Sequence, residues 1–420
     1  MSTSILTDGR KPKAESFDIQ KIRADFPILS EIVHGKPLVY LDSANTSQKP
    51  LAVITATDNY YRHANANIHR ATHLLSERAT ALYEGARKKA AVFLNAADSN
   101  SIVLTKGTTD GINLVAQSYG RSVLKAGDEI LLSWLEHHSN IVPWQLVAGQ
   151  TGATIKVVSI NEAGELDHDE YARLLSPRTK IVAVGHVSNA LGTINPIKEM
   201  IAQAHAVGAV VLVDGAQAAP HLVIDLQDLD CDFYVLSSHK MFGPTGTGVL
   251  YGRKALLESM PPYQGGGDMI ANVTFEKTLY NQIPYKFEAG TPNIAGVAGF
   301  GAAIDYLATI DRAAALAHED DVLAYATASV RAIPGARIIG EARHKTGVLS
   351  FLIEGVHPHD AGTILDQQGI AVRTGQHCAQ PVMDRFCIPA TIRASLAIYN
   401  TREDIDALVK GLLKVKEVFS

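Results

Sequence analysis

The chain has 420 residues, of which 46% are hydrophobic and 19% are charged. This composition is typical of a folded protein of two or three domains and excludes a disordered chain. The 38 Lys and Arg against 43 Asp and Glu give a formal net charge of −5, so no basic excess favours binding to nucleic acid or to an anionic membrane surface. Three cysteines are too few for a disulfide framework, which favours a reducing compartment.

The sequence predicts neither membrane insertion nor export. No apolar run reaches the ~18 residues that a membrane-spanning helix needs. Residues 1–23 lack the apolar stretch of a secretory signal. We therefore expect a soluble protein of the cytoplasm.

Short apolar runs alternate with helical patterns between residues 102 and 252. Runs of this length between helices are typical of a mostly parallel sheet that helices cover on both faces. The predicted class is α/β, with a seven-stranded large domain. The predicted strands are Ile102–Leu104, Glu129–Leu132, Ile155–Ile160, Lys180–Val184, Ala209–Val213, Phe233–Leu236 and Gly248–Tyr251.

The rest of the chain predicts loops and a second, smaller domain. Residues 251–295 are rich in Gly and Pro and predict long ordered loops around a site. From residue 347 the pattern is strand, helix, strand, and an amphipathic helix begins near Glu403. We predict an N-terminal arm (1–35) that packs with the small domain, a large domain (36–298) and a small α+β C-terminal domain (299–420).

Polar and titratable side chains follow five of the predicted strands directly. Ligands of open α/β sheets bind outside the carboxyl ends of the strands, so we expect a ligand site at this edge. The five groups are Lys106–Asp110, Glu136–His138, His186–Asn189, Asp214–Gln217 and Ser237–Lys240.

Three of these groups together suit pyridoxal 5'-phosphate (PLP). Gly107–Thr109 opens a helix, whose free N–H groups bind phosphate. Asp214 ends a buried strand, where a carboxylate needs a cationic partner. Lys240 follows an apolar run, and a lysine in such a pocket becomes a nucleophilic amine. Each has an ordinary structural alternative (a helix cap, a salt bridge, a surface lysine), but the combination matches PLP, with His137 or His138 against the ring and Asn189 and Gln217 at its 3-oxygen.

A candidate nucleophile lies near the C-terminus. Cys378 ends the segment RTGQHC, in which Arg373 and His377 favour the thiolate; a buried, inert cysteine is the alternative. Cys231 and Cys387 are predicted to be packing residues. Arg393 offers a planar fork for a substrate carboxylate or for a salt bridge between domains.

Ten stretches of the chain together resemble the group II (Suf-type) cysteine desulfurases, which are fold-type I PLP enzymes of aminotransferase class V. The resemblance runs from about residue 17 to the C-terminus. The stretches are LDSANTSQKP, NIHRATHLLSERAT, KGTTDGINLVA, LEHHSNIVPWQ, HVSNALGTINPI, VDGAQAAPH, DFYVLSSHKMFGPTGTGVLY, FEAGTPN, RTGQHCAQPVM and RASLAIYNT.

The resemblance implies a homodimeric enzyme that converts L-cysteine to L-alanine. The sulfur would remain on Cys378 as a persulfide and pass to an acceptor protein of the SufE or SufU type, for iron–sulfur cluster assembly. Lys240 looks like the Schiff-base lysine, Asp214 like the partner of the pyridine nitrogen, and His137 like the residue stacked on the ring. The other implied contacts are Gln217 to the 3-oxygen; Thr108, Thr109, Ser237 and His239 to the phosphate, with Thr291 supplied across a dimer interface; and Asn189, Arg393, Arg373, His69 and Arg70 to the substrate.

Four positions depart from the family pattern. Ala71 and Ser238 stand where glycine is usual, Asn45 replaces a small residue, and Gln376 stands where histidine is frequent. The first three are expected to add bulk near the site, so the substrate preference stays open.

Other functions compete with this prediction. A selenocysteine lyase acting on L-selenocysteine, or another class V enzyme such as a kynureninase or an epimerase, keeps the cofactor and changes the substrate. A metal-dependent hydrolase built from Glu136–His138 and His377–Cys378 has side chains that suit zinc, but no HExxH or paired CxxC accompanies them, and we expect no metal site. No Walker motif supports nucleotide binding.

Overall fold

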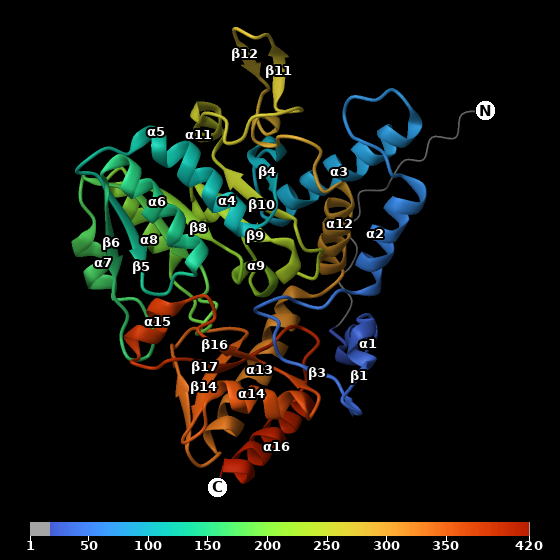
Figure 1. The fold of residues 1–420 in the computed structure, drawn as a ribbon, viewed down its shortest axis with the longest axis vertical. Coiled ribbons are helices and arrows are strands. Elements are labelled where there is room, and N and C mark those ends of the chain that lie inside the picture. Colours follow the sequence, from blue (N-terminus) through green and yellow to red (C-terminus); the bar gives the residue numbers. More distant parts are fainter. Residues whose placement is uncertain (1–16, 420) are drawn as a thin grey trace.

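The computed structural model describes residues 17–419. Two bodies, each with its own sheet, lie one above the other (Figure 1). The upper body holds the large sheet with its helices, and the lower body holds a smaller sheet and the C-terminus. Along the described chain, every helix is too short or too polar to cross a membrane.

The large sheet has seven strands in the order β4-β10-β9-β8-β7-β5-β6. Strand β10 runs antiparallel to both β4 and β9, and the other neighbours pair in parallel. The predicted α/β class and its mostly parallel seven-stranded sheet are therefore confirmed. The strands are β4 (Ile102–Thr105), β5 (Glu129–Ser133), β6 (Thr154–Val158), β7 (Thr179–Gly185), β8 (Val210–Asp214), β9 (Phe233–Ser237) and β10 (Gly248–Gly252).

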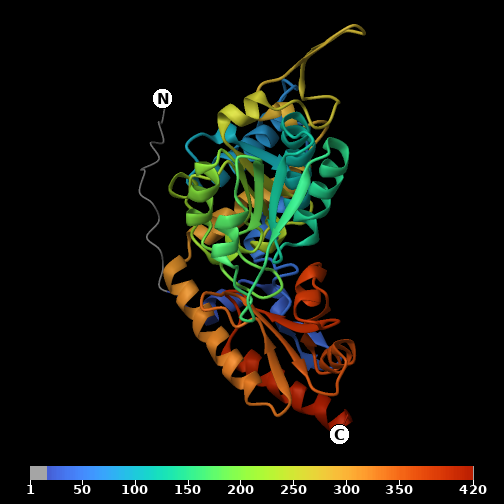
Figure 2. The same ribbon diagram turned by 90° about the vertical axis from the view of Figure 1, so that its left-hand side faces the viewer.

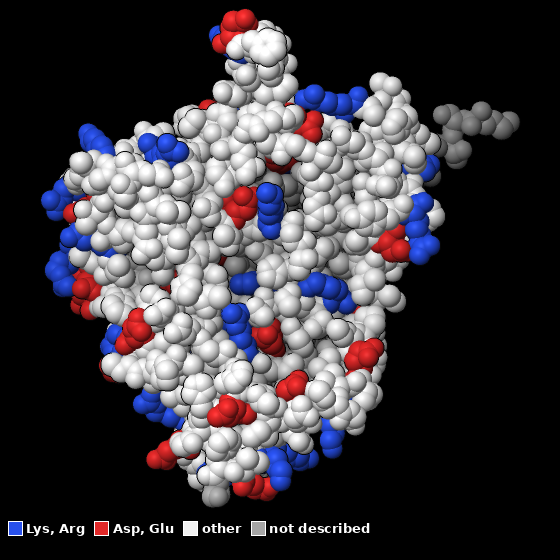
Figure 3. Space-filling model, in the orientation of Figure 1, with Lys and Arg blue, Asp and Glu red and all other residues white. Residues whose placement is uncertain are grey.

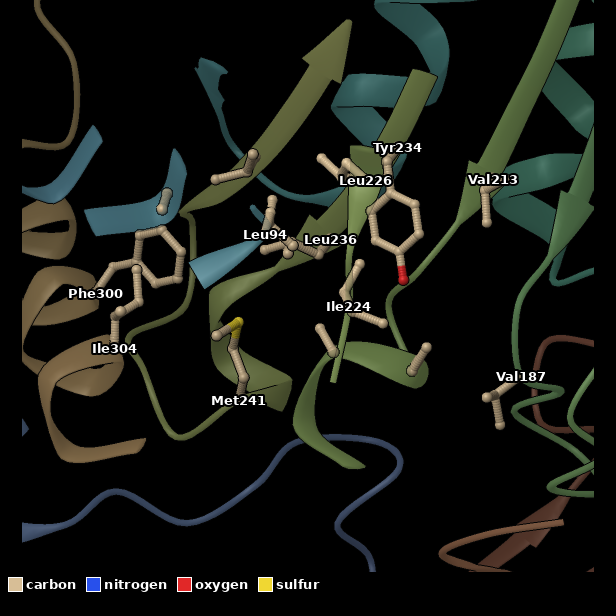
Figure 4. Packing of buried hydrophobic residues seen from close by; sticks show 14 of the residues in the cluster. Leu94, Val187, Val213, Ile224, Leu226, Tyr234, Leu236, Met241, Phe300 and Ile304 are labelled. Carbon is tan, nitrogen blue, oxygen red and sulfur yellow. The ribbon is translucent and has the colours of Figure 1, made fainter. Parts of the chain in front are cut away.

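Helices cover both faces of this sheet because its central strands are apolar on both sides. In β8, Val211 and Val213 belong to one buried cluster, and Leu212 between them belongs to another. Figure 4 shows part of the first cluster, with Val213 and Leu236 on neighbouring strands. The helices of this body are α2 (Leu51–His63), α3 (Leu74–Phe93), α4 (Thr108–Val115), α5 (Arg121–Val123), α6 (Val142–Thr151), α7 (His168–Leu174), α8 (Ile197–Ala206), α9 (Ala218–His221), α10 (Leu226–Leu229), α11 (Lys254–Ser259) and α12 (Ile294–Ala308).

The smaller sheet has four antiparallel strands in the order β13-β14-β17-β16. Helix α13 (Arg312–Arg331), the long orange helix in Figure 2, runs from the upper body along this sheet. A separate apolar core lies between the sheet and its helices. The other elements are β13 (Ala336–Ile339), β14 (Val348–Ile353), α14 (Pro358–Asp366), β15 (Ile370–Ala371), β16 (Arg373–Gly375), α15 (Gln380–Arg385), β17 (Thr391–Ser395) and α16 (Arg402–Phe419).

The N-terminal segment packs against the smaller sheet's body. Arg23, in the last turn of helix α1 (Ile19–Ala24), donates to the carbonyl oxygen of Tyr399 at 2.6 Å and pairs with Asp404 at 2.9 Å. Strand β3 (Val39–Tyr40) pairs in parallel with β15. The first 16 residues of the predicted arm lie outside the described residues. The division at residue 298 stays a prediction, and it falls inside α12, which packs against α2 and α3.

Residues 251–295 contain more regular structure than predicted. Besides α11, they form a hairpin of β11 (Ile270–Val273) and β12 (Thr278–Tyr280), which projects from the upper body (Figure 1). Phe275 in its turn is fully exposed. The hairpin lacks buried faces, so its sequence carries no clear alternation of apolar and polar residues.

Candidate active site

One cavity at the carboxyl end of the large sheet gathers residues from all five predicted groups. Asn45, Arg373 and Cys378 close it from the side of the smaller sheet. Figure 3 shows positive and negative side chains interspersed over one face of the molecule, without a block of one sign. The predicted site residues that line the cavity are Thr108, Thr109, His137, Asn189, Asp214, Gln217, Ser237, His239, Lys240, Arg373 and Cys378.

The start of helix α4 has the features of a phosphate site. Gly107 precedes it with φ +141°, and a Cβ on the neighbouring Gly248 would lie 2.5 Å from the Gly107 Cα. The N–H of Thr108 donates to Ser237 Oγ at 2.8 Å, and the two hydroxyls also lie 2.8 Å apart. Backbone N–H groups and hydroxyls at a helix N-terminus bind phosphate, so these residues fit the phosphate of PLP.

Lys240 and Asp214 supply the amine and the carboxylate. Burial lowers the pKa of Lys240 to about 8, and the negative charge of Asp214 partly opposes this shift. Asp214 is 8% exposed and accepts from the N–H of Ala216 at 3.0 Å. Burial raises its pKa, against the N–H of Ala216 and the charge of Lys240. Among the described residues no cation lies within salt-bridge distance of Asp214, which fits a protonated pyridine nitrogen in the cavity.

The two adjacent histidines have different positions. His137 lines the cavity, and its Nδ1 accepts from the N–H of Ser139 at 3.1 Å. Burial, followed by the charge of Lys240, lowers the pKa of His137 to about 3. The neutral ring then carries its proton on Nε2. His138 instead accepts from the N–H of Gln380 at 3.0 Å, which favours His137 as the residue against a ring in the cavity.

Glu136 also lines the cavity and was missed as a PLP-site residue. Its carboxylate accepts from Ser133 Oγ at 2.5 Å, Asn140 Nδ2 at 2.6 Å and the N–H of Gly185 at 3.2 Å. Burial raises its pKa to about 7, although these hydrogen bonds oppose the shift. These three donors satisfy the hydrogen-bonding needs of the buried carboxyl group. In the sequence, Glu136 is marked only by its place shortly after β5. The metal-hydrolase alternative included it for the same reason.

Cys378 reaches the cavity from the loop before α15. Its Sγ lies 3.3 Å from Nη2 of Arg373, which therefore donates to it. The prediction that His377 also favours the thiolate is wrong. Burial lowers the pKa of His377 to about 2, and its Nε2 lies 2.7 Å from the hydroxyl of Thr391, so the ring is neutral and contributes no positive charge.

Asn189 and Arg393 contact each other directly. Arg393 is fully buried and donates to the carbonyl oxygen of Asn189 at 2.8 Å, while Asn189 donates to the carbonyl oxygen of His377 at 2.6 Å. The Nε of Arg393 and the Oδ1 of Asn189 have no partner. Burial lowers the pKa of Arg393 to about 10. Asn189 lines the cavity and Arg393 lies behind its lining.

Besides Arg393, three other predicted residues do not line the cavity within one chain. Thr291 lines a different depression, together with Glu288. His69 contacts Glu84 at 2.9 Å, and Arg70 pairs with Asp268 at 3.1 Å. The structure of a single chain therefore does not bring these three together with Lys240.

The positions that depart from the family pattern behave differently from one another. Asn45 lines the cavity, as expected. The expectation that Ser238 adds bulk there is wrong, because its side chain is fully buried, outside the cavity lining, and directed at Gly243, where a Cβ would lie 2.0 Å from its Oγ. Ala71 and Gln376 are exposed and also outside the lining.

The other two cysteines have different environments. Cys231 is buried, as predicted, but Cys387 is exposed and therefore is not a packing residue. Its φ of +52° places it in a turn after α15. Between residues 17 and 419, no three His, Cys, Asp or Glu side chains cluster as ligands for a metal ion.

Comparisons with known proteins agree with this geometry. Residues 39–408 match the aminotransferase class V family. A cysteine desulfurase of Synechococcus elongatus is 52% identical over 99% of this chain, which spans 66% of that relative, and a probable cysteine desulfurase of Xylella fastidiosa is 51% identical over 96% of both chains. The crystal structure of the cysteine desulfurase CsdA of Escherichia coli, in an S-sulfonic acid form, superposes with a TM-score of 0.91 at 44% identity, covering 97% of this chain and 100% of that one.

The fold and the cavity are those of a PLP-dependent enzyme of aminotransferase class V. The chain belongs to the aminotransferase class V family and, within it, to the cysteine desulfurases.

Proposed function

We propose that the chain is a PLP-dependent cysteine desulfurase that converts L-cysteine to L-alanine and keeps the sulfur on Cys378 as a persulfide. The observation that carries this proposal is the joint presence of Lys240, Asp214 and Cys378 in the lining of one cavity. An amine and a buried carboxylate from the ends of two neighbouring strands meet a thiol from the C-terminal part of the chain there, and each matches one need of the reaction.

The cavity's own residues supply binding, proton transfer and orientation. PLP bound here would supply an aldehyde for the Lys240 amine and a ring that withdraws electrons from the substrate's α-carbon. With a pKa of about 8, Lys240 Nζ is partly unprotonated near neutral pH and is suited to carry the α-proton. Thr108, Thr109, Ser237 and His239 would hold the phosphate, Asp214 the pyridine nitrogen, Gln217 the 3-oxygen, and His137 the ring face.

Cys378 supplies the sulfur acceptor. Its thiolate attacks the sulfur of the substrate, so that an S–S bond forms as the substrate's C–S bond breaks. The β-carbon, which carried the sulfur, takes a proton, and the organic product is alanine. Cysteine plus the enzyme thiol thus give alanine plus the enzyme persulfide, and no external oxidant is needed. Arg373 at 3.3 Å from Sγ stabilises the attacking thiolate. Asn189 in the cavity lining, with Arg393 directly behind it, would receive the substrate carboxylate.

The proposed partners are those that the resemblance to the family implies. We propose a group II enzyme of the cytoplasm that acts as a homodimer and passes its persulfide sulfur to a SufE- or SufU-type acceptor for iron–sulfur cluster assembly. Exposed apolar side chains on neighbouring helices α2 and α3 support an interface: Leu51, Ile54, Tyr61, Leu74, Leu75 and Leu82. A second copy is also the natural source of Thr291, His69 and Arg70, which in one chain lie outside the cavity.

Product analysis tests the function. Purified protein loaded with PLP should form equal amounts of alanine and sulfide from L-cysteine in the presence of a reducing thiol. The variant Cys378→Ala should lose both products from L-cysteine. If that variant still releases selenide and alanine from L-selenocysteine at the rate of the unchanged protein, and the unchanged protein prefers that substrate, the alternative of a selenocysteine lyase is correct instead.

A further inference from the structure

Arg373, the residue that contacts the candidate nucleophile, lies directly opposite another arginine. Strands β16 and β17 pair Arg373 with Arg393 in register. Like charges opposite each other across a strand pair repel. Asp42, at 3.2 Å from Nη2 of Arg393, neutralises that arginine, and this leaves Arg373 in need of another acceptor to fix its position.

Asn45 supplies that acceptor. Its Oδ1 accepts from Nη1 of Arg373 at 2.7 Å, while Nη2 of the same guanidinium donates to Cys378 Sγ at 3.3 Å. The Nδ2 of Asn45 donates to Oδ2 of Asp42 at 3.1 Å. A continuous series of contacts therefore joins Arg393, Asp42, Asn45, Arg373 and the thiol.

The geometry of the guanidinium makes this contact directional. Its nitrogens lie in one plane, so that fixing Nη1 on Asn45 also fixes the direction in which Nη2 donates. Asn45 is neutral, and it orients the arginine without cancelling its charge, as a carboxylate at the same place would do. A small apolar residue at position 45 would leave the charge in place but could not orient the arginine.

We propose that Asn45 is a positioning residue of the sulfur-transfer step, which holds the guanidinium of Arg373 against Cys378. This inference deepens the proposed function by adding a residue that controls the reactivity of the nucleophile. It is read out on the thiol itself, so it can be tested even if the protein acts on a different amino acid.

The test is alkylation of the thiols in the PLP-loaded protein, without cysteine and after reduction. The rate constant for iodoacetamide is measured at Cys378 between about pH 6 and pH 9, by mass spectrometry of the peptides. The exposed Cys387 serves as an internal reference in each sample. For Asn45→Ala we expect the rate at Cys378 near neutral pH to fall by about threefold, because the thiolate loses a fixed cationic neighbour; the rate at Cys387 should not change.

Two further variants separate positioning from general damage. Asn100→Ala is the matched control, because Asn100 is an exposed asparagine that also donates to a nearby aspartate, at 3.4 Å; it should leave Cys378 unchanged. Arg373→Ala and the double variant Asn45→Ala/Arg373→Ala complete a cycle. If Asn45 acts through Arg373, the double variant should react as slowly as Arg373→Ala and no slower. An unchanged Cys378 profile in Asn45→Ala, or losses that add in the double variant, would overturn the proposal.

Discussion

The N–H of His138 donates to the carbonyl oxygen of Cys378 at 2.7 Å. This hydrogen bond joins the loop that carries the candidate nucleophile to the segment after β5 that carries His137. Gln380, just beyond Cys378, donates its N–H to the His138 ring as well. The thiol is therefore held at the cavity by the large sheet itself, and residues more than 200 positions apart in the chain form one site.

Removing the thiol should stop sulfur release and leave the cofactor in place. Cys378→Ser keeps the size of the side chain but replaces the nucleophile with a poor one, so we expect sulfide production from L-cysteine to fall by about a hundredfold or more. The visible absorption band of the cofactor should not change, because Cys378 contacts Arg373 rather than the phosphate residues. Full sulfide production by this variant would refute the role of Cys378; Cys387→Ser is the control that should keep full activity.

Cofactor uptake should follow the protonation of Lys240. Burial lowers its pKa to about 8, so the reactive neutral amine grows as pH rises through that value, and apoprotein should take up PLP faster from about pH 7 to pH 9. The charge of Asp214 raises the lysine pKa. Asp214→Asn should therefore move the midpoint of the uptake rate to lower pH. The change is followed by stopped-flow absorbance, and a midpoint that moves to higher pH would contradict this electrostatic relation.

Glu136 should make stability depend on pH. Burial raises its pKa from an ordinary 4.5 to about 7, so the folded state favours the protonated carboxyl. Its contribution to stability is complete below about pH 4.5 and is lost as pH rises through about 7, a difference of about 3 kcal/mol at most. Asp214 faces the carboxyl from β8 with the same charge, and this adds to the cost of ionisation.

The variant Glu136→Gln removes this ionisation. The difference in melting temperature between this variant and the unchanged protein should shift steadily in favour of the variant from pH 5 to pH 8. This holds whether the variant is more or less stable than the unchanged protein at pH 5. Asp228→Asn is a suitable control, because Asp228 is exposed. A difference between Glu136→Gln and the unchanged protein that stays constant over this range would show that Glu136 does not titrate there.

The features that follow from short stretches of sequence were predicted correctly. Each of the seven predicted strands lies within two residues of a strand in the structure, because apolar runs bounded by helices carry that information locally. The gathering of polar groups at one sheet edge followed from parallel pairing alone. Lys240 and Asp214 share the cavity for this reason.

The features that were missed depend on contacts between distant segments. The sequence predicts only that Asn45 adds bulk. Its hydrogen bond to Arg373 cannot be predicted without knowing that residues 45 and 373 meet in the fold. The sequence predicts His377 as a neighbour that favours the Cys378 thiolate, but Thr391 on β17 holds the His377 ring on the buried side. Ser238 points at Gly243 rather than into the cavity, which the turn after β9 decides and the residue types do not.

The central claim is that one amine, that of Lys240, forms an imine with PLP. The direct test is borohydride reduction of the yellow holoprotein, followed by peptide mapping of the fixed pyridoxyl label. Lys49 is the internal control, because burial lowers its pKa to about 8 as well and its Nζ lies 3.1 Å from the carbonyl oxygen of His239, outside the cavity lining. The account predicts the label on the Lys240 peptide alone and none on Lys240→Ala protein. A colourless protein that takes up no PLP, or a label on Lys49, would contradict it.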